Sequence, residues 1–328
     1  MPALRVAYFG TPDFAVPSLT RVIDAGYPVV AVITQPDRPR GRGQKPSQGP
    51  VKMLAAARGI PVLQPERLRN DEFLGALAAL APDIGVVAAY GKILPEPVLT
   101  LPRLGLINVH ASLLPRWRGA SPVHRAVMAG DPVTGVSIMR VLRELDAGGV
   151  FDVARRPIGP NDTADEVERD LAAIGAELLV KVLGAIERGE ALETPQDPSQ
   201  VTYAPLLTKE EGRIDWGAAA RSIHNQVRGL HPWPLAFTFL NGARVIVRRS
   251  ALPEDADARA TAPDLAIPAS GTAAAPGEVV SVRGEHISVA TGEGLLHLVQ
   301  IQSEGRRALS AREFAAGMRL APGVRFGL

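Results

Sequence analysis

The amino-acid sequence predicts two domains, an α/β domain built on a parallel sheet and a smaller β domain that follows it. Three observations predict this fold class. The chain of 328 residues exceeds the usual size of a single domain. Its first half alternates short apolar runs with segments of helical spacing, which is typical of a parallel sheet flanked by helices. Its last third changes to the two-residue alternation of antiparallel strands.

The elements of the first half follow from these patterns. Five apolar runs are predicted as strands, at residues 4–9, 29–34, 61–63, 84–88 and 106–110. Three segments with helical spacing lie between them, at residues 15–25, 51–58 and 71–80. Further along, residues 135–141 and 150–156 are predicted as a strand pair, and residues 163–188 as one long helix that begins at Asp162 or Thr163. These elements close the first domain at about residue 189.

The remainder of the chain is predicted as a linker and a β domain. Residues 190–208 are polar and contain proline, as a connection between domains does. Beyond them, the strands predicted at 237–240 and 244–247 flank Asn241-Gly242, the strongest short hairpin signal. Three further strands are predicted at 278–282, 287–290 and 295–299. We therefore assign residues 1–189 to the first domain and 209–328 to a small antiparallel barrel or sandwich.

One stretch inside the second domain lacks a strand pattern. Residues 251–276 are rich in Ala, Pro and Asp, and they contain one Arg against four acidic residues. We interpret them as a loop inserted between strands. Without this segment the second domain is moderately basic, which is compatible with a partner that carries phosphate groups.

Composition excludes several classes of protein. The chain contains no cysteine, which excludes disulfides, a thiol nucleophile and zinc held by thiolates. No apolar run approaches the roughly 20 residues of a membrane-spanning helix, and no signal-peptide pattern follows the first strand, so we expect a cytoplasmic protein. No long apolar stripe is evident, and we expect a monomer.

The turn after the first strand is a candidate ligand site. Gly10-Thr11-Pro12-Asp13-Phe14 lies between a predicted strand and a predicted helix, where open α/β sheets bind their ligands. The turn lacks the G-x-G-x-x-G spacing of dinucleotide-binding proteins, and no phosphate-binding lysine motif occurs elsewhere in the chain. A nicotinamide-dependent oxidoreductase is therefore disfavoured.

A second candidate site lies at the end of the fifth predicted strand. Asn108 and His110 are two residues apart, so their side chains project to the same face at the carboxyl edge of the sheet. An amide can stabilise the oxygen charge of a tetrahedral intermediate, and an imidazole can exchange protons near neutral pH, as acyl transfer requires. Asp146 precedes Ala147-Gly148-Gly149 in a turn, which an aspartate often stabilises through its own side chain. Taken alone, each of these residues is better explained by a structural role.

The combination of motifs is more specific than any one of them. The sequence contains, in order, FGTPDFA at 9–15, QPDRP at 35–39, NVH at 108–110, SLLPRWRGA at 112–120 and LDAG at 145–148, followed by IDW at 214–216 and PWP at 232–234. In order and spacing these motifs resemble the methionyl-tRNA formyltransferase family, and the resemblance covers almost the whole chain. It implies a Rossmann-like formyltransferase domain followed by a smaller C-terminal β barrel similar to an OB fold.

The resemblance also implies the chemistry. Asn108, His110 and Asp146 match the catalytic residues of the family, and Ser112, Leu113, Leu114 and Pro115 match its folate-binding segment. The formyl donor is then 10-formyltetrahydrofolate, and the acceptor is the α-amino group of methionine on initiator tRNA. Asn108 and protonated His110 would stabilise the oxygen of the tetrahedral intermediate, while Asp146 orients the ring. The proton route through His110, Asp146 or a water stays open.

The basic loop at residues 35–52 is the expected tRNA contact. In the family the equivalent loop contacts the acceptor stem, so we expect Arg38, Arg40, Arg42 and Lys45 to bind phosphates or base edges. Arg244, Arg248 and Arg249 in the second domain are further candidates for contacts with the RNA. Gly149 departs from the family pattern, in which proline or aspartate is common at this position.

The other histidines give no sign of a metal site. His124, His224, His231, His286 and His297 have no metal-ligand spacing with one another or with carboxylates, so the sequence predicts chemistry without a metal.

Three alternative functions remain open from the sequence. A formyltransferase acting on a nucleotide-linked amino sugar would share Asn108, His110 and Asp146 but would have no need of the basic loop. A hydrolase would release formate from formylated folate without an amine acceptor. An RNA-binding protein without catalytic activity would depend on the basic loop and not on His110.

Overall fold

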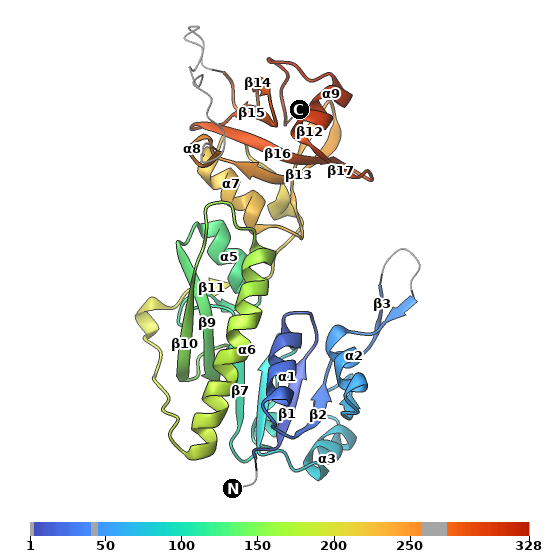
Figure 1. Ribbon diagram of the computed structural model, residues 1–328, viewed down its shortest axis with the longest axis vertical. Coiled ribbons are helices and arrows are strands. Elements are labelled where there is room, and N and C mark those ends of the chain that lie inside the picture. Colours follow the sequence, from blue (N-terminus) through green and yellow to red (C-terminus); the bar gives the residue numbers. More distant parts are fainter. Residues whose placement is uncertain (1–2, 41–44, 257–273, 328) are drawn as a thin grey trace. The chain divides into compact units, whose positions relative to one another are not determined.

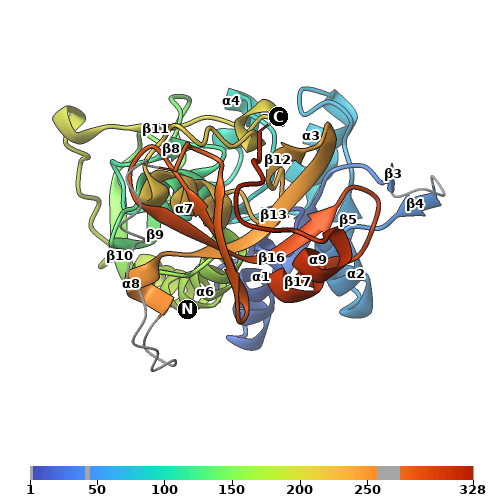
Figure 2. The ribbon, with the colours of Figure 1, turned by 90° about the horizontal axis from the view of Figure 1, so that it is seen from above.

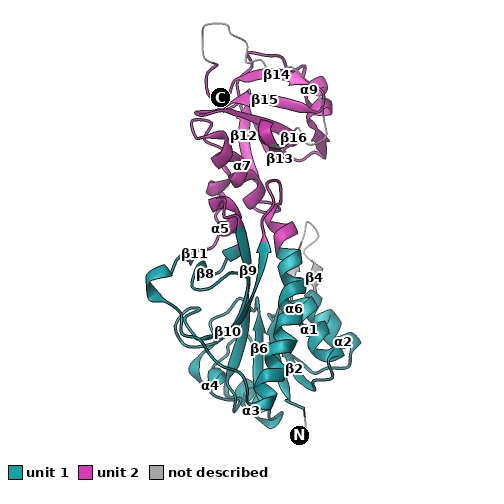
Figure 3. Cartoon of the chain, turned by 60° about the vertical axis from the view of Figure 1, so that its left-hand side comes forward, with its two compact units in different colours: residues 1–122, 133–156, 168–205 teal, residues 123–132, 157–167, 206–328 magenta. Residues whose placement is uncertain are grey.

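The computed structural model describes residues 3–40, 45–256 and 274–327 (Figure 1). The described elements fall into two compact units, shown in two colours in Figure 3. The first comprises residues 1–122, 133–156 and 168–205, and the second comprises residues 123–132, 157–167 and 206–328. Each unit is therefore built from three separate segments of the chain. The predicted boundaries at residues 189 and 209 instead divide the chain into two continuous domains. Most of the predicted linker, up to residue 205, belongs to the first unit.

The first unit is built on a seven-stranded sheet with the strand order β10-β9-β7-β6-β1-β2-β5. The strands are β1 (Val6–Gly10), β2 (Val29–Ile33), β5 (Val62–Leu63), β6 (Ile84–Ala88), β7 (Leu106–His110), β9 (Val133–Arg140) and β10 (Val150–Pro157). Every residue of β1 and β6 is buried, as expected for central strands covered on both faces. All the predicted strands of this unit are present, but β9 runs antiparallel to β7, so the sheet is mixed.

Helices pack against this sheet, and the predicted ones begin and end within a residue or two of their predicted bounds. They are α1 (Ala15–Asp24), α2 (Pro50–Ala57), α3 (Asp71–Ala79) and α6 (Ala164–Arg188), to which the structure adds α4 (Glu96–Leu99). A further helix, α5 (Pro122–Ala129), belongs almost entirely to the second unit. One buried cluster joins Phe9 and Ile33 of the sheet to Phe73 and Leu77 of α3 and Val98 of α4. The side chain of Asn70 caps α3 by accepting a hydrogen bond of 2.8 Å from the backbone N–H of Glu72.

Two short strand pairs lie outside the main sheet. The antiparallel pair β3 (Arg38–Arg40) and β4 (Lys45–Ser47) forms a hairpin within the predicted basic loop. The parallel pair β8 (Arg118–Gly119) and β11 (Tyr203–Ala204) joins the segment after β7 to the end of the first unit. The sequence predicted neither pair.

The second unit contains a six-stranded antiparallel sheet, which is seen in red and orange in Figure 2. Its strands are β12 (Ala236–Leu240), β13 (Ala243–Ala251), β14 (Val279–Arg283), β15 (His286–Ala290), β16 (Leu295–Ser303) and β17 (Ala308–Ser310), with helices α7 (Ala220–Gly229), α8 (Pro253–Ala256) and α9 (Ala311–Met318). Two 3-10 turns lie at Pro198–Gln200 in the first unit and Glu210–Gly212 in the second.

The predicted hairpin of the second unit is present. Asn241 and Gly242 have φ angles of 51° and 75°, and Leu240 pairs with Ala243 across the turn. Positive φ at both central residues is what a two-residue hairpin turn requires. Helices α7 and α9 were not predicted, although α9 begins with a complete capping box between Ser310 and Glu313. Residues 257–273 of the predicted inserted loop lie outside the described residues.

Candidate active site

The carboxyl end of β7 carries two polar side chains on one face of the strand. β7 lies between β6 and β9 in the sheet, and the Cα atoms of Asn108 and His110 pair with Met139 and Ser137 of β9. Because the two residues are separated by one position, both side chains project to the same side. The side chain of His110 is 5% exposed, and Asn108 is half-buried.

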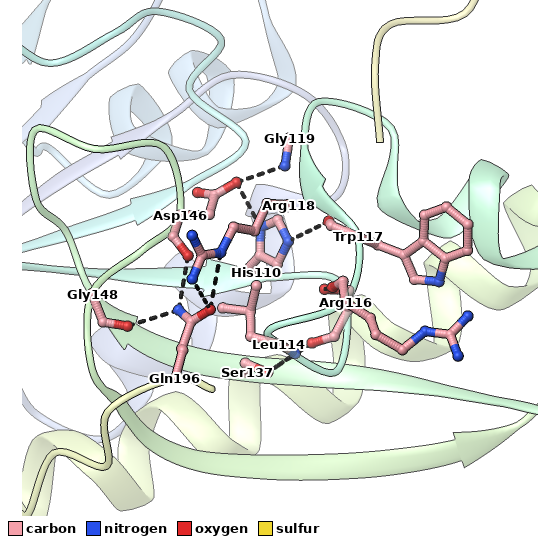
Figure 4. Close-up of polar contacts among 11 residues, drawn as sticks. His110, Leu114, Arg116, Trp117, Arg118, Gly119, Ser137, Asp146, Gly148 and Gln196 are labelled. Atoms are coloured by element: carbon pink, nitrogen blue, oxygen red, sulfur yellow. Dashed lines mark hydrogen bonds and ion pairs between the residues drawn. The ribbon is translucent and has the colours of Figure 1, made fainter. Parts of the chain in front are cut away.

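One hydrogen bond of His110 fixes which ring nitrogen carries the proton (Figure 4). Nε2 lies 3.0 Å from the carbonyl oxygen of Trp117. A carbonyl oxygen only accepts, so Nε2 carries a proton and donates it to Trp117. Nδ1 lies 3.7 Å from Oδ2 of Asp146, which is beyond hydrogen-bond distance. Nδ1 is therefore the ring atom that remains available for chemistry.

Asp146 is held by the backbone of the segment that follows β7. Its Oδ2 accepts a hydrogen bond of 2.8 Å from the N–H of Gly119. Asp146 has a φ angle of 47°, a left-handed conformation that aspartate tolerates better than most residues. The carboxylate is thus anchored on one side by a backbone donor while the same oxygen faces the imidazole of His110.

Two glycines let the loop of Asp146 lie close to its neighbours. A Cβ atom on Gly148 would lie 2.0 Å from the carbonyl oxygen of Arg140, and one on Gly149 would lie 2.9 Å from Cβ of Glu193. Larger residues at either position would therefore displace the loop.

The amide of Asn108 has no hydrogen-bond partner within the part of the chain that the structure describes. An amide at the edge of a sheet with two free N–H donors can bind the oxygen of a ligand. Asn108 and His110 together thus present an amide donor and an imidazole on one face.

The segment after His110 forms a tight turn in which Ser112 has a structural part. The Ser112 side chain is completely buried, and its hydroxyl donates a hydrogen bond of 2.6 Å to the carbonyl oxygen of Arg116. Its carbonyl accepts a hydrogen bond of 2.7 Å from the hydroxyl of Ser137, which also accepts one of 3.1 Å from the N–H of Leu114. Of the four residues predicted to bind folate, Leu113, Leu114 and Pro115 are the partly exposed ones.

Gln196, which the sequence did not single out, connects two parts of this site. Gln196 accepts hydrogen bonds of 3.0 and 2.7 Å from Nε and Nη2 of Arg118. Its amide nitrogen donates hydrogen bonds of 2.8 Å to the carbonyl oxygens of Asp146 and Gly148. Gln196 lies in a polar stretch between two prolines, where neither periodicity nor motif indicates a contact 50 residues away in sequence.

The residues expected to contact tRNA lie on and around the β3–β4 hairpin. Arg40 pairs with Lys45 across the hairpin, and Arg38 pairs with Ser47. Arg42, the fourth residue of this prediction, lies outside the described residues. Within the predicted basic loop at residues 35–52, residues 38–40 and 45–47 are therefore paired strands, and α2 begins at Pro50.

The three arginines of β13 each have a partner inside the second unit. The guanidinium of Arg244 lies 4.0 Å from the centre of the Phe237 ring, and Arg248 donates a hydrogen bond of 3.1 Å to Gln302. Arg249 forms an ion pair of 2.6 Å with Glu166. These contacts give each side chain a structural role within the second unit.

No metal site is found among the residues that the structure describes, since no group of three or more His, Asp or Glu side chains could hold an ion. Within those same residues, the helices include none that is both long and apolar enough to cross a membrane.

The site lies on a fold whose two parts match known family models. Residues 4–183 match the formyl transferase family, and residues 206–319 match the formyl transferase C-terminal domain. With an amide and an imidazole at the carboxyl edge of the sheet, this combination defines a formyl transferase.

Similar proteins narrow this class. The chain is 44% identical over 99% of its length to the methionyl-tRNA formyltransferase of Heliobacterium modesticaldum, which it covers completely. It is 48% identical to the methionyl-tRNA formyltransferase of Synechococcus sp. strain JA-3-3Ab, over 98% of each chain. The chain belongs to the methionyl-tRNA formyltransferase family.

Solved structures of more distant proteins share the fold. An N-formyltransferase from Helicobacter canadensis, in complex with folinic acid and dTDP-3-aminofucose, matches 90% of this chain and 98% of its own with a TM-score of 0.64 and 17% identity. HypX from Aquifex aeolicus in complex with tetrahydrofolic acid matches 95% of this chain with a TM-score of 0.60 and 17% identity. This chain covers only 47% of that HypX chain. At these identities the likeness concerns the fold alone.

Proposed function

We propose that this chain transfers the formyl group of 10-formyltetrahydrofolate to the α-amino group of methionine on initiator tRNA, with Asn108, His110 and Asp146 around the reacting carbon. One observation carries the proposal. Among the described residues, the amide of Asn108 has no hydrogen-bond partner, and it lies on the same face of β7 as His110, whose Nδ1 makes no hydrogen bond. The chain that presents these two groups belongs to the methionyl-tRNA formyltransferase family. Membership gives the reaction, and the two side chains give the donors that it needs.

Asn108 and His110 act on the oxygen of the formyl group. The amino nitrogen of methionine attacks the formyl carbon, and the carbonyl oxygen becomes negatively charged in the tetrahedral intermediate. The Asn108 amide donates to this oxygen, and His110 donates through Nδ1 when the ring carries both protons, since Nε2 already donates to Trp117. When the intermediate collapses, the bond to the folate nitrogen breaks and the formyl group stays on methionine.

One proton moves during this exchange. The attacking amine loses a proton, and the departing folate nitrogen gains one, so the overall reaction balances without a further reactant. His110 and Asp146 are the titratable groups at this edge of the sheet, 3.7 Å apart. Asp146 keeps the ring in place, and the negative charge of its carboxylate stabilises the doubly protonated ring. Leu113, Leu114 and Pro115 supply the surface against which we place the folate.

The acceptor is a nucleic acid, so the protein needs a basic surface as well as a catalytic group. Arg38, Arg40, Arg42 and Lys45 supply it in the proposal. The described part of this segment, residues 38–40 and 45–47, is a strand pair that projects from the sheet (Figure 1). Phosphate contacts of this kind position the tRNA, and the reacting methionine is then selected at the sheet edge. We place the enzyme in the cytoplasm and expect it to act as a monomer.

Transfer of labelled formyl from 10-formyltetrahydrofolate tests the proposal. Methionyl initiator tRNA, methionyl elongator tRNA, free methionine and a nucleotide-linked amino sugar are offered as parallel acceptors, and free formate is measured in each mixture. Label on methionyl initiator tRNA alone supports the proposal. Label on the amino sugar, or formate released without an acceptor, would replace it with one of the alternative functions of the same site.

A further inference from the structure

A segment far from β7 in sequence holds the two loops that surround His110. We call residues 193–204 the strap; it begins five residues after α6 ends and includes β11. The strap belongs to the first unit, so its contacts with the site are internal to that unit. Because the strap contacts both loops, its residues can affect the reaction through the position of these loops without touching the substrate.

At one end the strap binds the loop of Asp146. Thr194 and Val150 exchange two backbone hydrogen bonds of 2.9 Å each, at the start of β10. Glu193 forms an ion pair of 2.7 Å with Arg140, at the end of β9. The strap thus joins both ends of the loop that carries Asp146.

At its other end the strap binds the segment that carries Trp117 and Gly119. The hydroxyl of Thr202 accepts a hydrogen bond of 2.9 Å from the N–H of Trp117, and its carbonyl accepts one of 2.9 Å from Arg118. β11 then pairs with β8. Trp117 and Gly119 are the residues whose backbone atoms bond His110 and Asp146.

Gln196 connects these two regions through one side chain (Figure 4). A primary amide has two donors and an oxygen that accepts two hydrogen bonds. All four are used, since the oxygen accepts from two nitrogens of Arg118 and the nitrogen donates to the carbonyls of Asp146 and Gly148. The partners fix the orientation of the amide, because a guanidinium only donates and a carbonyl only accepts.

We propose that Gln196 is a positioning residue, whose amide ties Arg118 to the Asp146 loop and so holds the Asp146 carboxylate in place against Nδ1 of His110. This inference rests on the proposed roles of His110 and Asp146. Gln196 bonds the backbone of Asp146 and not its carboxylate, so it acts through the position of Asp146. The separation of 3.7 Å between Nδ1 and Oδ2 leaves no direct hydrogen bond that would hold the pair by itself.

Gln196→Met tests the proposal with nearly unchanged side-chain volume and none of the four hydrogen bonds. We expect kcat for formyl transfer to fall about 10- to 100-fold, since a small misplacement of a catalytic group has an effect of this order. The KM for the formyl donor should change little, because the folate surface is not touched. The pH dependence of kcat should change on the same side of the pH optimum, acidic or basic, as it does in Asp146→Asn.

Gln196→Glu provides a second variant with a different defect. Its carboxylate still accepts from Arg118 but places a negative oxygen against the carbonyls of Asp146 and Gly148. We expect it to reduce kcat as well, even though its pairing with Arg118 is retained. Full activity in both variants, each shown to be folded by circular dichroism, overturns the proposal.

The double variant Asp146→Asn with Gln196→Met separates this proposal from the assignment of the catalytic residues. If Gln196 acts through Asp146, the double variant should have the kcat of Asp146→Asn alone, because the two losses are not additive. Additive losses would mean that Gln196 acts by another route, which contradicts the inference. Unchanged activity in Asp146→Asn would instead reject the role of Asp146 in the proposed function.

Gln200→Met is the matched control. Gln200 lies on the same strap, is exposed, and its side chain donates a hydrogen bond of 2.9 Å to Asp197. Gln200→Met makes the same chemical change four residues from Gln196, at a side chain that contacts neither Arg118 nor the Asp146 loop. We expect kcat, KM and the pH profile to match those of the unaltered protein. A loss equal to that of Gln196→Met would show a general effect of the strap and would overturn the specific role of Gln196.

Discussion

The imidazole of His110 and the carboxylate of Asp146 face each other without a hydrogen bond, while the backbone holds each of them separately. Nδ1 and Oδ2 are 3.7 Å apart, whereas Nε2 lies 3.0 Å from the Trp117 carbonyl and Oδ2 lies 2.8 Å from the Gly119 nitrogen. A pair held in this way leaves room at Nδ1 for a substrate atom. The proposed chemistry therefore depends on the backbone at Trp117 and Gly119, which keeps the two side chains at this separation.

Asn108→Ala should lower kcat by about 100-fold or more, because it removes a donor to the charged oxygen of the tetrahedral intermediate. The KM for the formyl donor should stay nearly unchanged if this hydrogen bond forms only in the transition state. Steady-state kinetics of formyl transfer to methionyl-tRNA measures both constants. A variant that loses folate affinity and keeps kcat would assign Asn108 to binding of the donor.

Asn70→Ala is the control for this substitution. Asn70 caps α3 through its hydrogen bond to the Glu72 nitrogen. Its loss should reduce the free energy of unfolding by about 1 kcal/mol, with kcat unchanged. The comparison separates a loss of stability from a loss of catalysis.

Gly148→Ala should displace the loop of Asp146, because the new Cβ would lie 2.0 Å from the Arg140 carbonyl oxygen. We expect the free energy of unfolding to fall by about 1–3 kcal/mol and kcat to fall with it. Denaturant unfolding and transfer kinetics measure the two effects. Wild-type values of both would mean that the loop can move away from Arg140 at no cost.

The matched control is Gly75→Ala within α3. The space around a Cβ at Gly75 is empty to 4 Å, and the position is an exposed helix interior. Alanine there should stabilise the protein by about 0.5–1 kcal/mol. Kinetic constants for formyl transfer should be unaffected.

The sequence predicted the centre of the first unit's sheet well because its central strands β1 and β6 are buried on both faces and therefore continuously apolar. β6 and β7 have the predicted bounds of 84–88 and 106–110. Asn108 and His110 were predicted to share a face from their spacing alone, and β7 has that geometry. The reversed direction of β9 was not predicted, since an apolar run has the same pattern in either direction.

The contacts of Gln196 and Thr202 could not be predicted from the sequence. Each depends on long-range placement of a polar segment, and local patterns carry no information about which loop such a segment will meet. The helix α7 was missed for a different reason. Its buried residues Ile223, His224, Val227 and Arg228 include two polar ones, which obscure the apolar stripe.

Affinity for tRNA should depend steeply on salt if the β3–β4 hairpin contacts phosphates. Replacing Arg38, Arg40 or Lys45 by alanine should each reduce the slope of log Kd against log salt by about one unit. Filter binding between 50 and 200 mM salt, roughly the range over which such contacts weaken, measures the slope. A slope unaffected by all three changes would remove the hairpin from the interface.

Arg103→Ala is the control for the hairpin variants. Arg103 forms an exposed ion pair of 2.7 Å with Asp83 and precedes β7, so it lies at the amino end of the strand, away from the edge with His110. The same loss of one positive charge should leave the salt slope unchanged. An equal change in slope would indicate a general effect of net charge.

The acid stability of the second unit should depend on Glu166, which links the start of α6 to β13. Burial raises the pKa of Glu166, but hydrogen bonds from the backbone N–H and hydroxyl of Thr163 and from Arg249 outweigh it and hold the pKa at about 2. The folded pKa lies below the ordinary value of 4.5, so the stabilisation is complete above pH 4.5, roughly, and is lost as pH falls toward 2.

Glu166→Gln should therefore reduce the free energy of unfolding by about 1–2 kcal/mol at neutral pH and by much less near pH 2. Urea unfolding at a series of pH values gives the comparison with the unaltered chain. Glu254→Gln is the control, because its ion pair with Arg221 is exposed on both sides and should contribute little at any pH. A difference between Glu166→Gln and the unaltered chain that stays constant from neutral pH to pH 2 would contradict the role of the ionised carboxylate and leave only the packing of the side chain.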